Sequence, residues 1–75
     1  MMIKFSRHAK RRAKLYNIPD SAVTNILKRM NLGQGEHEII KAVPGFKYPF
    51  KVVVCVEGGT LTVITNYLLK KRREK

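Results

Sequence analysis

Residues 50–68 read FKVVVCVEGGTLTVITNYL and decide the fold of this 75-residue chain. Two runs rich in β-branched residues flank Gly58-Gly59, a pair that readily adopts the positive φ angles of a two-residue hairpin turn. The pattern predicts antiparallel strands over 50–57 and 60–68, with Glu57 opposite Thr60. In this register, the face expected to pack against the helices carries Phe50, Val52, Val54 and Val56 on one strand and Leu61, Val63, Thr65 and Tyr67 on the other.

The second face of this predicted hairpin is mixed in character. It carries Lys51, Val53, Cys55 and Glu57, paired with Asn66, Ile64, Thr62 and Thr60. Lys51 and Asn66 are thus predicted to face each other. We expect this face to be open to solvent or to a ligand, because helices packed on the other face leave it uncovered.

Two helices are predicted ahead of the hairpin. Ser6 can cap a helix over 7–16, whose apolar side contains Phe5, Ala9, Ala13 and Tyr16. A second helix is predicted over 19–30, because Pro19-Asp20 suits a first turn and apolar residues follow at helical spacing. Another strand is predicted over 36–43.

These elements predict an α+β fold, with two N-terminal helices packed on one face of a three- to four-stranded antiparallel sheet. The predicted core contains Val23, Ile26, Leu27, Val52, Val54, Leu61 and Val63. Residues 1–75 are expected to form one domain with a frayed basic tail at 71–75.

The amino-acid composition indicates a folded protein without a disulfide, a zinc site or a membrane span. A hydrophobic fraction of 44% fits a folded chain, and a single cysteine forms no internal disulfide. No His and Cys spacing resembles a zinc site, so no metal or other cofactor is expected. The longest apolar run, 52–56, is too short to span a bilayer, and we expect a cytoplasmic protein without a membrane partner.

The net charge of +11 is concentrated at the two ends of the chain. Residues 1–14 hold six basic residues and no acid, and residues 70–75 hold five basic residues and one acid. A charged surface kept for solubility usually combines Lys with Glu, and here the acids are missing. The pattern favours a polyanionic partner, and nucleic acid over a membrane because the basic segment lacks a large aromatic face.

The order of motifs resembles a small bacterial and archaeal family within the RelE/ParE-like toxin superfamily, near the BrnT toxins. The Ser-x-His-Ala-x-x-Arg start of that family matches residues 6–12, and its second-helix start matches Ile18-Pro19-Asp20. Its hairpin with Glu-Gly at the turn matches Glu57-Gly58, followed by a strand that reads like 62–65 with Tyr67 after it.

This resemblance implies an initial extended segment and a helix pair on a curved antiparallel sheet. It also implies a toxin that cuts mRNA or inhibits a cellular machine and is neutralised by a cognate antitoxin. Cleaving members of the superfamily use basic and aromatic residues without metal. The expected function is therefore that of a RelE/BrnT-like toxin or toxin-derived protein acting on RNA, with metal-independent mRNA endoribonuclease activity as its enzymatic form.

Metal-free RNA cleavage needs a base, an acid and cations near the phosphate. Histidine transfers protons near neutral pH, and His8, at the border of the first helix's apolar and basic sides, is the candidate base, expected to be half-buried. The alternative is a structural histidine at the helix edge, hydrogen-bonded to the sheet or to a loop carbonyl. Arg12, one turn further along, and Lys51 on the open sheet face complete the predicted catalytic set. The predicted nucleic-acid contacts are Arg7, Lys10, Arg11, Lys14, Asn66, Lys70, Lys71, Arg72 and Arg73.

The remaining polar and aromatic residues have structural interpretations that carry equal or greater weight. His37 fits a solvated strand end, Tyr48 a loop packed on itself, Cys55 a small hydrophobe and Tyr67 the core. Two alternative functions stay open at this point. One is a non-catalytic nucleic-acid-binding module, and the other is an interaction protein whose Val53, Cys55 and Ile64 face forms a homodimer or binds an antitoxin.

Overall fold

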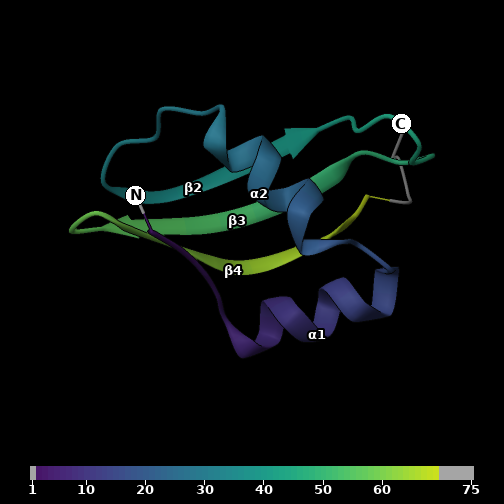
Figure 1. Cartoon of the computed structure of the whole chain (residues 1–75), viewed down its shortest axis with the longest axis horizontal. Helices are drawn as coiled ribbons and strands as arrows, with labels where there is room; N and C mark the ends of the chain where they lie inside the picture. The colour runs from purple at the N-terminus through teal and green to yellow at the C-terminus, as the bar shows by residue number, and fades with distance from the viewer. Residues whose placement is uncertain (1, 70–75) are drawn as a thin grey trace, which may run out of the picture.

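The computed structural model describes residues 2–69, which form an α+β fold of two helices and a four-stranded sheet (Figure 1). In chain order the elements are β1 (Met2–Phe5), α1 (Arg7–Tyr16), α2 (Asp20–Lys28), β2 (Gly35–Lys41), β3 (Phe50–Glu57) and β4 (Thr60–Leu68). The predicted tail at 71–75 lies outside the described residues. No helix in residues 2–69 is both long and apolar enough to cross a membrane.

The sheet is mixed, with the strand order β1-β4-β3-β2. β3 pairs antiparallel with β2 and with β4, whereas β1 runs parallel to β4 and aligns Phe5 with Val63. The prediction of an antiparallel sheet is therefore wrong at β1. Four residues are too few for the alternation of Ile3 and Phe5 with Met2 and Lys4 to reveal a strand or its partner.

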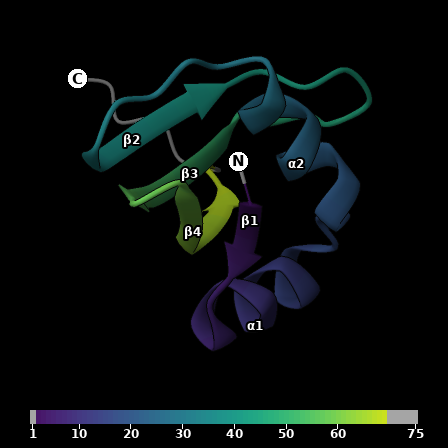
Figure 2. The same ribbon diagram turned by 60° about the vertical axis from the view of Figure 1, so that its left-hand side comes forward.

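The two helices occupy different places around the sheet. α2 lies over one face, and α1 lies beside β4 at the edge of the sheet where β1 also pairs (Figures 1 and 2). Both helices contribute to one core, through Ala9 and Ala13 of α1 and Val23, Ile26 and Leu27 of α2. Small alanine side chains let α1 approach β4 closely.

The predicted core is confirmed. Its seven residues are all buried, and the same cluster also contains Ala9, Ala13, Ile18, Ile39, Phe50 and Val56. The Phe46 ring meets Phe50 edge-on at 4.8 Å between centroids, so the loop between β2 and β3 packs against the end of this core.

The β3–β4 hairpin forms as predicted near its turn and departs from the prediction beyond it. Gly58 and Gly59 have φ angles of 52° and 82°, and Glu57 pairs with Thr60. The register then shifts between Val53 and Val54, so that Ile64 is an additional residue in β4, a β-bulge.

The bulge exchanges the two faces of β4 for the rest of the strand. Val52 pairs with Asn66, which is fully buried, and Lys51 pairs with Tyr67 on the second face. The predicted core positions of Thr65 and Tyr67 are therefore wrong, and so is the predicted pairing of Lys51 with Asn66. A one-residue shift inverts every later side chain because strand side chains alternate between faces.

Local signals placed the helix ends within two residues. The Ser6 hydroxyl accepts a hydrogen bond from the Ala9 amide at 3.0 Å, which confirms the predicted cap of α1. α1 ends at Asn17, whose φ of 56° is the left-handed conformation that often ends a helix. α2 begins at Asp20, after Pro19, and ends at Lys28, two residues before the predicted end.

Candidate nucleic-acid interface

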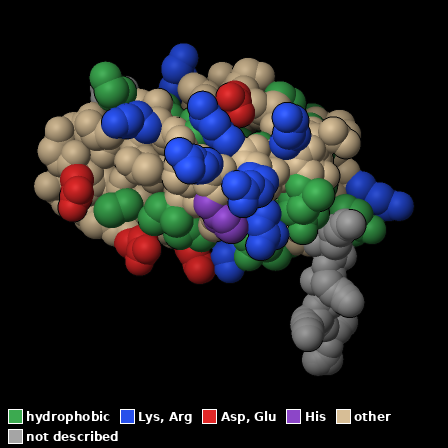
Figure 3. Space-filling view, turned by 90° about the horizontal axis from the view of Figure 1, so that it is seen from below, with side chains coloured by type: hydrophobic (Ala, Val, Ile, Leu, Met, Phe, Trp, Pro, Cys, Tyr) green, Lys and Arg blue, Asp and Glu red, His purple; other side chains and the backbone are tan. Residues whose placement is uncertain are grey.

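Four cations project from the exposed side of α1. Arg7, Lys10, Arg11 and Lys14 are exposed, while Ala9 and Ala13 on the opposite side are buried. We call these four residues the α1 basic surface. Lys and Arg side chains gather over this helix in Figure 3. Like charges so close together repel one another, which favours the binding of an anion.

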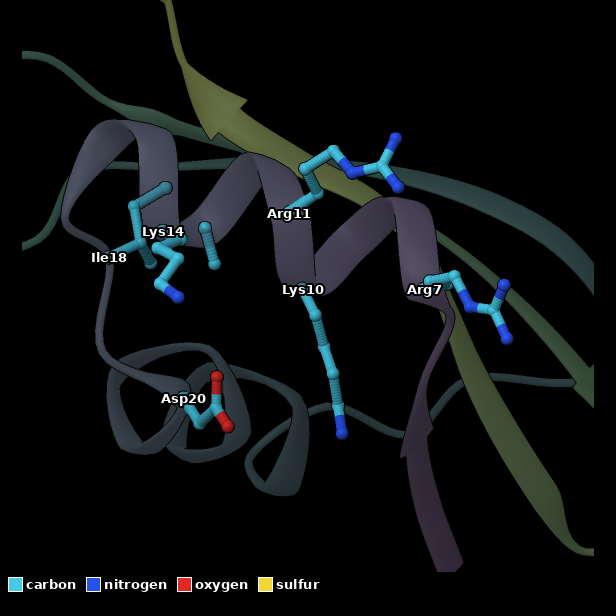
Figure 4. A pocket seen from close by; sticks show the side chains of 7 residues that line it. Arg7, Lys10, Arg11, Lys14, Ile18 and Asp20 are labelled. Atoms are coloured by element: carbon cyan, nitrogen blue, oxygen red, sulfur yellow. The ribbon is translucent and has the colours of Figure 1, made fainter.

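One carboxylate stands near this surface without neutralising it. Asp20 and the α1 basic surface line an open hollow of about 520 Å³. In Figure 4, Lys10 extends toward the start of α2, where Asp20 lies, and Arg7 and Arg11 point away from it. Within residues 2–69 no carboxylate forms an ion pair with any of the four cations. Among residues 2–69, their positive charge is therefore not compensated by an ion pair.

The predicted catalytic residue His8 is exposed, which corrects the expectation that it would be half-buried. α1 lies at the edge of the sheet, so the border of its apolar side faces solvent and not the core. His8 lines a second hollow, of about 460 Å³, with Arg11, Arg12, Lys14 and Leu15. Leu15 is 69% exposed there.

Arg12 and Lys51, two predicted catalytic residues, are both neighbours of Tyr67, Arg12 through its side chain and Lys51 through strand pairing. The Arg12 guanidinium carbon is 5.6 Å from the centroid of the Tyr67 ring, a cation–π contact. Lys51 is the direct cross-strand neighbour of Tyr67. The Tyr16 ring approaches Tyr67 from α1, at 6.4 Å between centroids. The end of the second sheet face and the border of α1 therefore form one continuous surface.

The positive charge of Lys51 is partly compensated by β2. Its Nζ lies 3.4 Å from a carboxylate oxygen of Glu38, and their side chains are 23% and 62% exposed. An exposed pair of this kind contributes about 0–1 kcal/mol to stability. A phosphate group can therefore compete with Glu38 for Lys51.

Asn66 is wrongly predicted as a nucleic-acid contact. The bulge turns it into the core, where it is 0% exposed. Its side-chain nitrogen and oxygen have no hydrogen-bond partner among residues 2–69. The other predicted contacts near the C-terminus, Lys70, Lys71, Arg72 and Arg73, lie outside the described residues.

His37, Tyr48 and Cys55, the other residues with structural interpretations, have partners other than Tyr67. The His37 ring nitrogen Nε2 is 2.8 Å from the Gly33 carbonyl oxygen, at the start of β2. Lys47 lies 5.9 Å from the centroid of the Tyr48 ring within the same loop. Cys55 is half-buried on the second face, opposite Thr62. In the described part of the chain no three His, Cys, Asp or Glu side chains are grouped to hold a metal ion.

Tyr67 is the interface residue that sequence reasoning missed. A regular hairpin register puts it in the core, and nothing between residues 60 and 68 signals the bulge. The bulge coincides with contacts from elsewhere in the chain, where Ser6 donates hydrogen bonds to the Val63 and Ile64 carbonyls through its backbone N–H and its hydroxyl, at 3.0 and 2.8 Å. Because Ser6 and Ile64 are 58 positions apart, a local sequence pattern does not reveal this contact.

No family model, curated protein or solved structure matches the chain, so comparison with known proteins assigns no function to these residues.

Proposed function

We propose that this protein binds RNA through the α1 basic surface. The observation that carries the proposal is the set of four exposed cations on one side of a single helix, with no ion-pairing carboxylate among the described residues. Such cations bind phosphates and release the counterions of the nucleic acid. Tyr67 and Tyr16 beside the surface favour RNA, since aromatic rings stack with unpaired bases.

Within this proposal the protein is a toxin or a toxin-derived protein of the RelE/BrnT type, with a cognate antitoxin as its protein partner. The motif behind the resemblance, residues 6–12, supplies the helix cap, the buried Ala9 and a large part of the α1 basic surface.

A second candidate function is metal-independent RNA cleavage, favoured by the contact of Arg12 with Tyr67 and by the position of Lys51 opposite Tyr67 on β3. In this reaction His8 takes the proton of a 2′-hydroxyl, whose oxygen attacks the adjacent phosphorus. The bond from phosphorus to the 5′-oxygen breaks, and the leaving oxygen takes a proton from a solvent water molecule, whose hydroxide accepts the proton held by His8. Arg12 and Lys51 stabilise the charge that develops on the phosphate. The products are a 2′,3′-cyclic phosphate and a 5′-hydroxyl.

Binding is tested by titrating labelled single-stranded RNA at several salt concentrations. For a single strand, the logarithm of the affinity falls by about 0.7 per logarithmic unit of salt for each phosphate neutralised. Replacing Lys10, Arg11 and Lys14 by Ala is expected to flatten this slope by about 2. The matched control replaces Lys28, Arg29 and Lys41, three exposed cations outside α1, and is expected to change the slope little. Absence of RNA binding by the folded wild type at low salt would overturn the proposal.

Cleavage is tested separately, by incubating RNA with the protein in the presence of a chelator. The wild type is expected to give 2′,3′-cyclic phosphate ends, and His8→Ala or Lys51→Ala to reduce them strongly while Lys28→Ala retains activity. Expression of the same variants gives a growth readout. A harmless wild type that binds RNA and leaves it intact would replace the cleavage candidate with the non-catalytic binding module.

A further inference from the structure

The Tyr67 ring has the surroundings of a base-stacking site. It lies on the second face of the sheet and is half-buried, with Arg12 and the Tyr16 ring against it. Arg12 holds it from α1, and Lys51 is its neighbour on β3. An aromatic ring with a cation against it and a second cation on the neighbouring strand complements a nucleobase with its flanking phosphates.

This part of the face remains accessible because the described elements leave it uncovered. α2 packs on the opposite face, and α1 lies beside the edge of the sheet (Figure 2), from where Arg12 and Tyr16 contact Tyr67. Tyr67 and the α1 basic surface are connected through Arg12, which lies one residue after Arg11 on the helix. A strand bound along α1 can therefore continue onto the sheet.

We propose that Tyr67 stacks on an unpaired base and that the interface thereby selects single-stranded over double-stranded RNA. This inference rests on the proposed RNA binding and adds the strandedness of the ligand. Bases of a duplex are stacked on each other and paired, so their faces cannot reach a tyrosine on a sheet. A duplex keeps only the phosphate contacts of α1.

The carboxylates on β2 mark where the bound RNA strand is expected to leave the sheet. Glu38 lies beside Lys51, and Glu36, also exposed, is two residues earlier on the same strand. Their negative charge repels a phosphate backbone. The strand is therefore expected to cross from α1 to Tyr67 and Lys51 and to leave the sheet before β2.

The test compares Tyr67→Leu and Tyr67→Phe with the wild type on a single strand and on a duplex of equal phosphate number. Loss of stacking is expected to weaken single-strand binding by about 5- to 150-fold. Tyr67→Phe is expected to retain most of the affinity, because the ring remains. Binding to the duplex and the salt slope are expected to stay unchanged in both variants, since the cations are intact.

A second measurement keeps Tyr67 in place and reads its contact with the base directly. The chain has three tyrosines and no tryptophan, so a protein with Tyr16→Phe and Tyr48→Phe reports the fluorescence of Tyr67 alone. Single-stranded RNA is expected to quench this signal with the same midpoint as the binding curve, and the duplex to leave it unchanged.

Two results overturn the stacking proposal while RNA binding stands. One is equal weakening of single-strand and duplex binding by Tyr67→Leu, and the other is unchanged Tyr67 fluorescence at saturating single strand. Failure of the wild type to bind either RNA would instead remove the proposed function. The two failures are therefore distinguishable.

Discussion

The Ser6 hydroxyl donates a hydrogen bond of 2.8 Å to the carbonyl oxygen of Ile64 and accepts one from the Ala9 amide. Ile64 is the bulge residue of β4, and Ser6 is the cap of α1. One side chain therefore joins the start of the basic helix to the irregularity that turns Tyr67 outward. The candidate interface depends on this junction, because it brings Arg12 to the Tyr67 ring.

The junction makes Ser6→Ala a sharp test of the fold. This variant loses the cap and leaves the Ile64 carbonyl without its side-chain donor. We expect the free energy of unfolding to fall by about 1–3 kcal/mol, measured by urea denaturation. Ser6→Thr keeps the hydroxyl and serves as the control. A loss below about 0.5 kcal/mol in Ser6→Ala would show that neither bond holds the junction.

Asn66→Val is expected to stabilise the protein by about 1 kcal/mol, because the buried amide has no hydrogen-bond partner among residues 2–69 and valine suits a strand. In a domain of this size that change corresponds to a rise in Tm of about 4–8 °C. Asn66→Asp is the opposing control, expected to destabilise by burying a charge. Destabilisation by Asn66→Val would mean that the amide is bonded after all.

The helices and the core were predictable because each depends on a local pattern. Helical spacing located Val23 and Ile26, and the Gly58-Gly59 turn set the register as far as Val63. The bulge at Ile64 was not predictable, since it coincides with contacts from Ser6 at the other end of the chain. Because of this one additional residue, Asn66 lies in the core and Tyr67 on the second face, the reverse of the prediction.

The candidate site was predictable in its charge and not in its arrangement. Helical spacing alone put Lys10 and Lys14 on the exposed side of α1. The position of α1 at the edge of the sheet is a tertiary feature, set by β1 and by contacts with β4, and it exposes His8. It also brings Arg12 to the ring of Tyr67, a contact between residues 55 positions apart.

Repulsion within the α1 basic surface predicts that anions stabilise the free protein. A ligand that binds only the folded state raises its stability by mass action. We expect polyphosphate to raise Tm by several degrees relative to chloride at equal ionic strength, measured by thermal denaturation followed by circular dichroism. The variant with Ala at 10, 11 and 14 is expected to lose most of this rise, and the variant with Ala at 28, 29 and 41 to keep it. Equal rises in both variants would assign the effect to general screening.

Glu38→Gln is expected to strengthen RNA binding. The change removes the carboxylate 3.4 Å from the Lys51 Nζ and so frees that cation for a phosphate. An exposed ion pair is worth about 0–1 kcal/mol, so affinity at low salt should rise by up to about 5-fold with little change in the stability of the fold.

Glu57→Gln is the control for this prediction. It makes the same change of charge six residues from Lys51 along β3, or about 20 Å away, and is expected to change affinity less. Affinity is measured for both variants by fluorescence anisotropy with one labelled single strand. If the two variants gain equally, the gain reflects net charge alone, and Lys51 makes no specific contact with RNA. A gain confined to Glu38→Gln that disappears in the double variant with Lys51→Ala would identify Lys51 as the group that receives the phosphate.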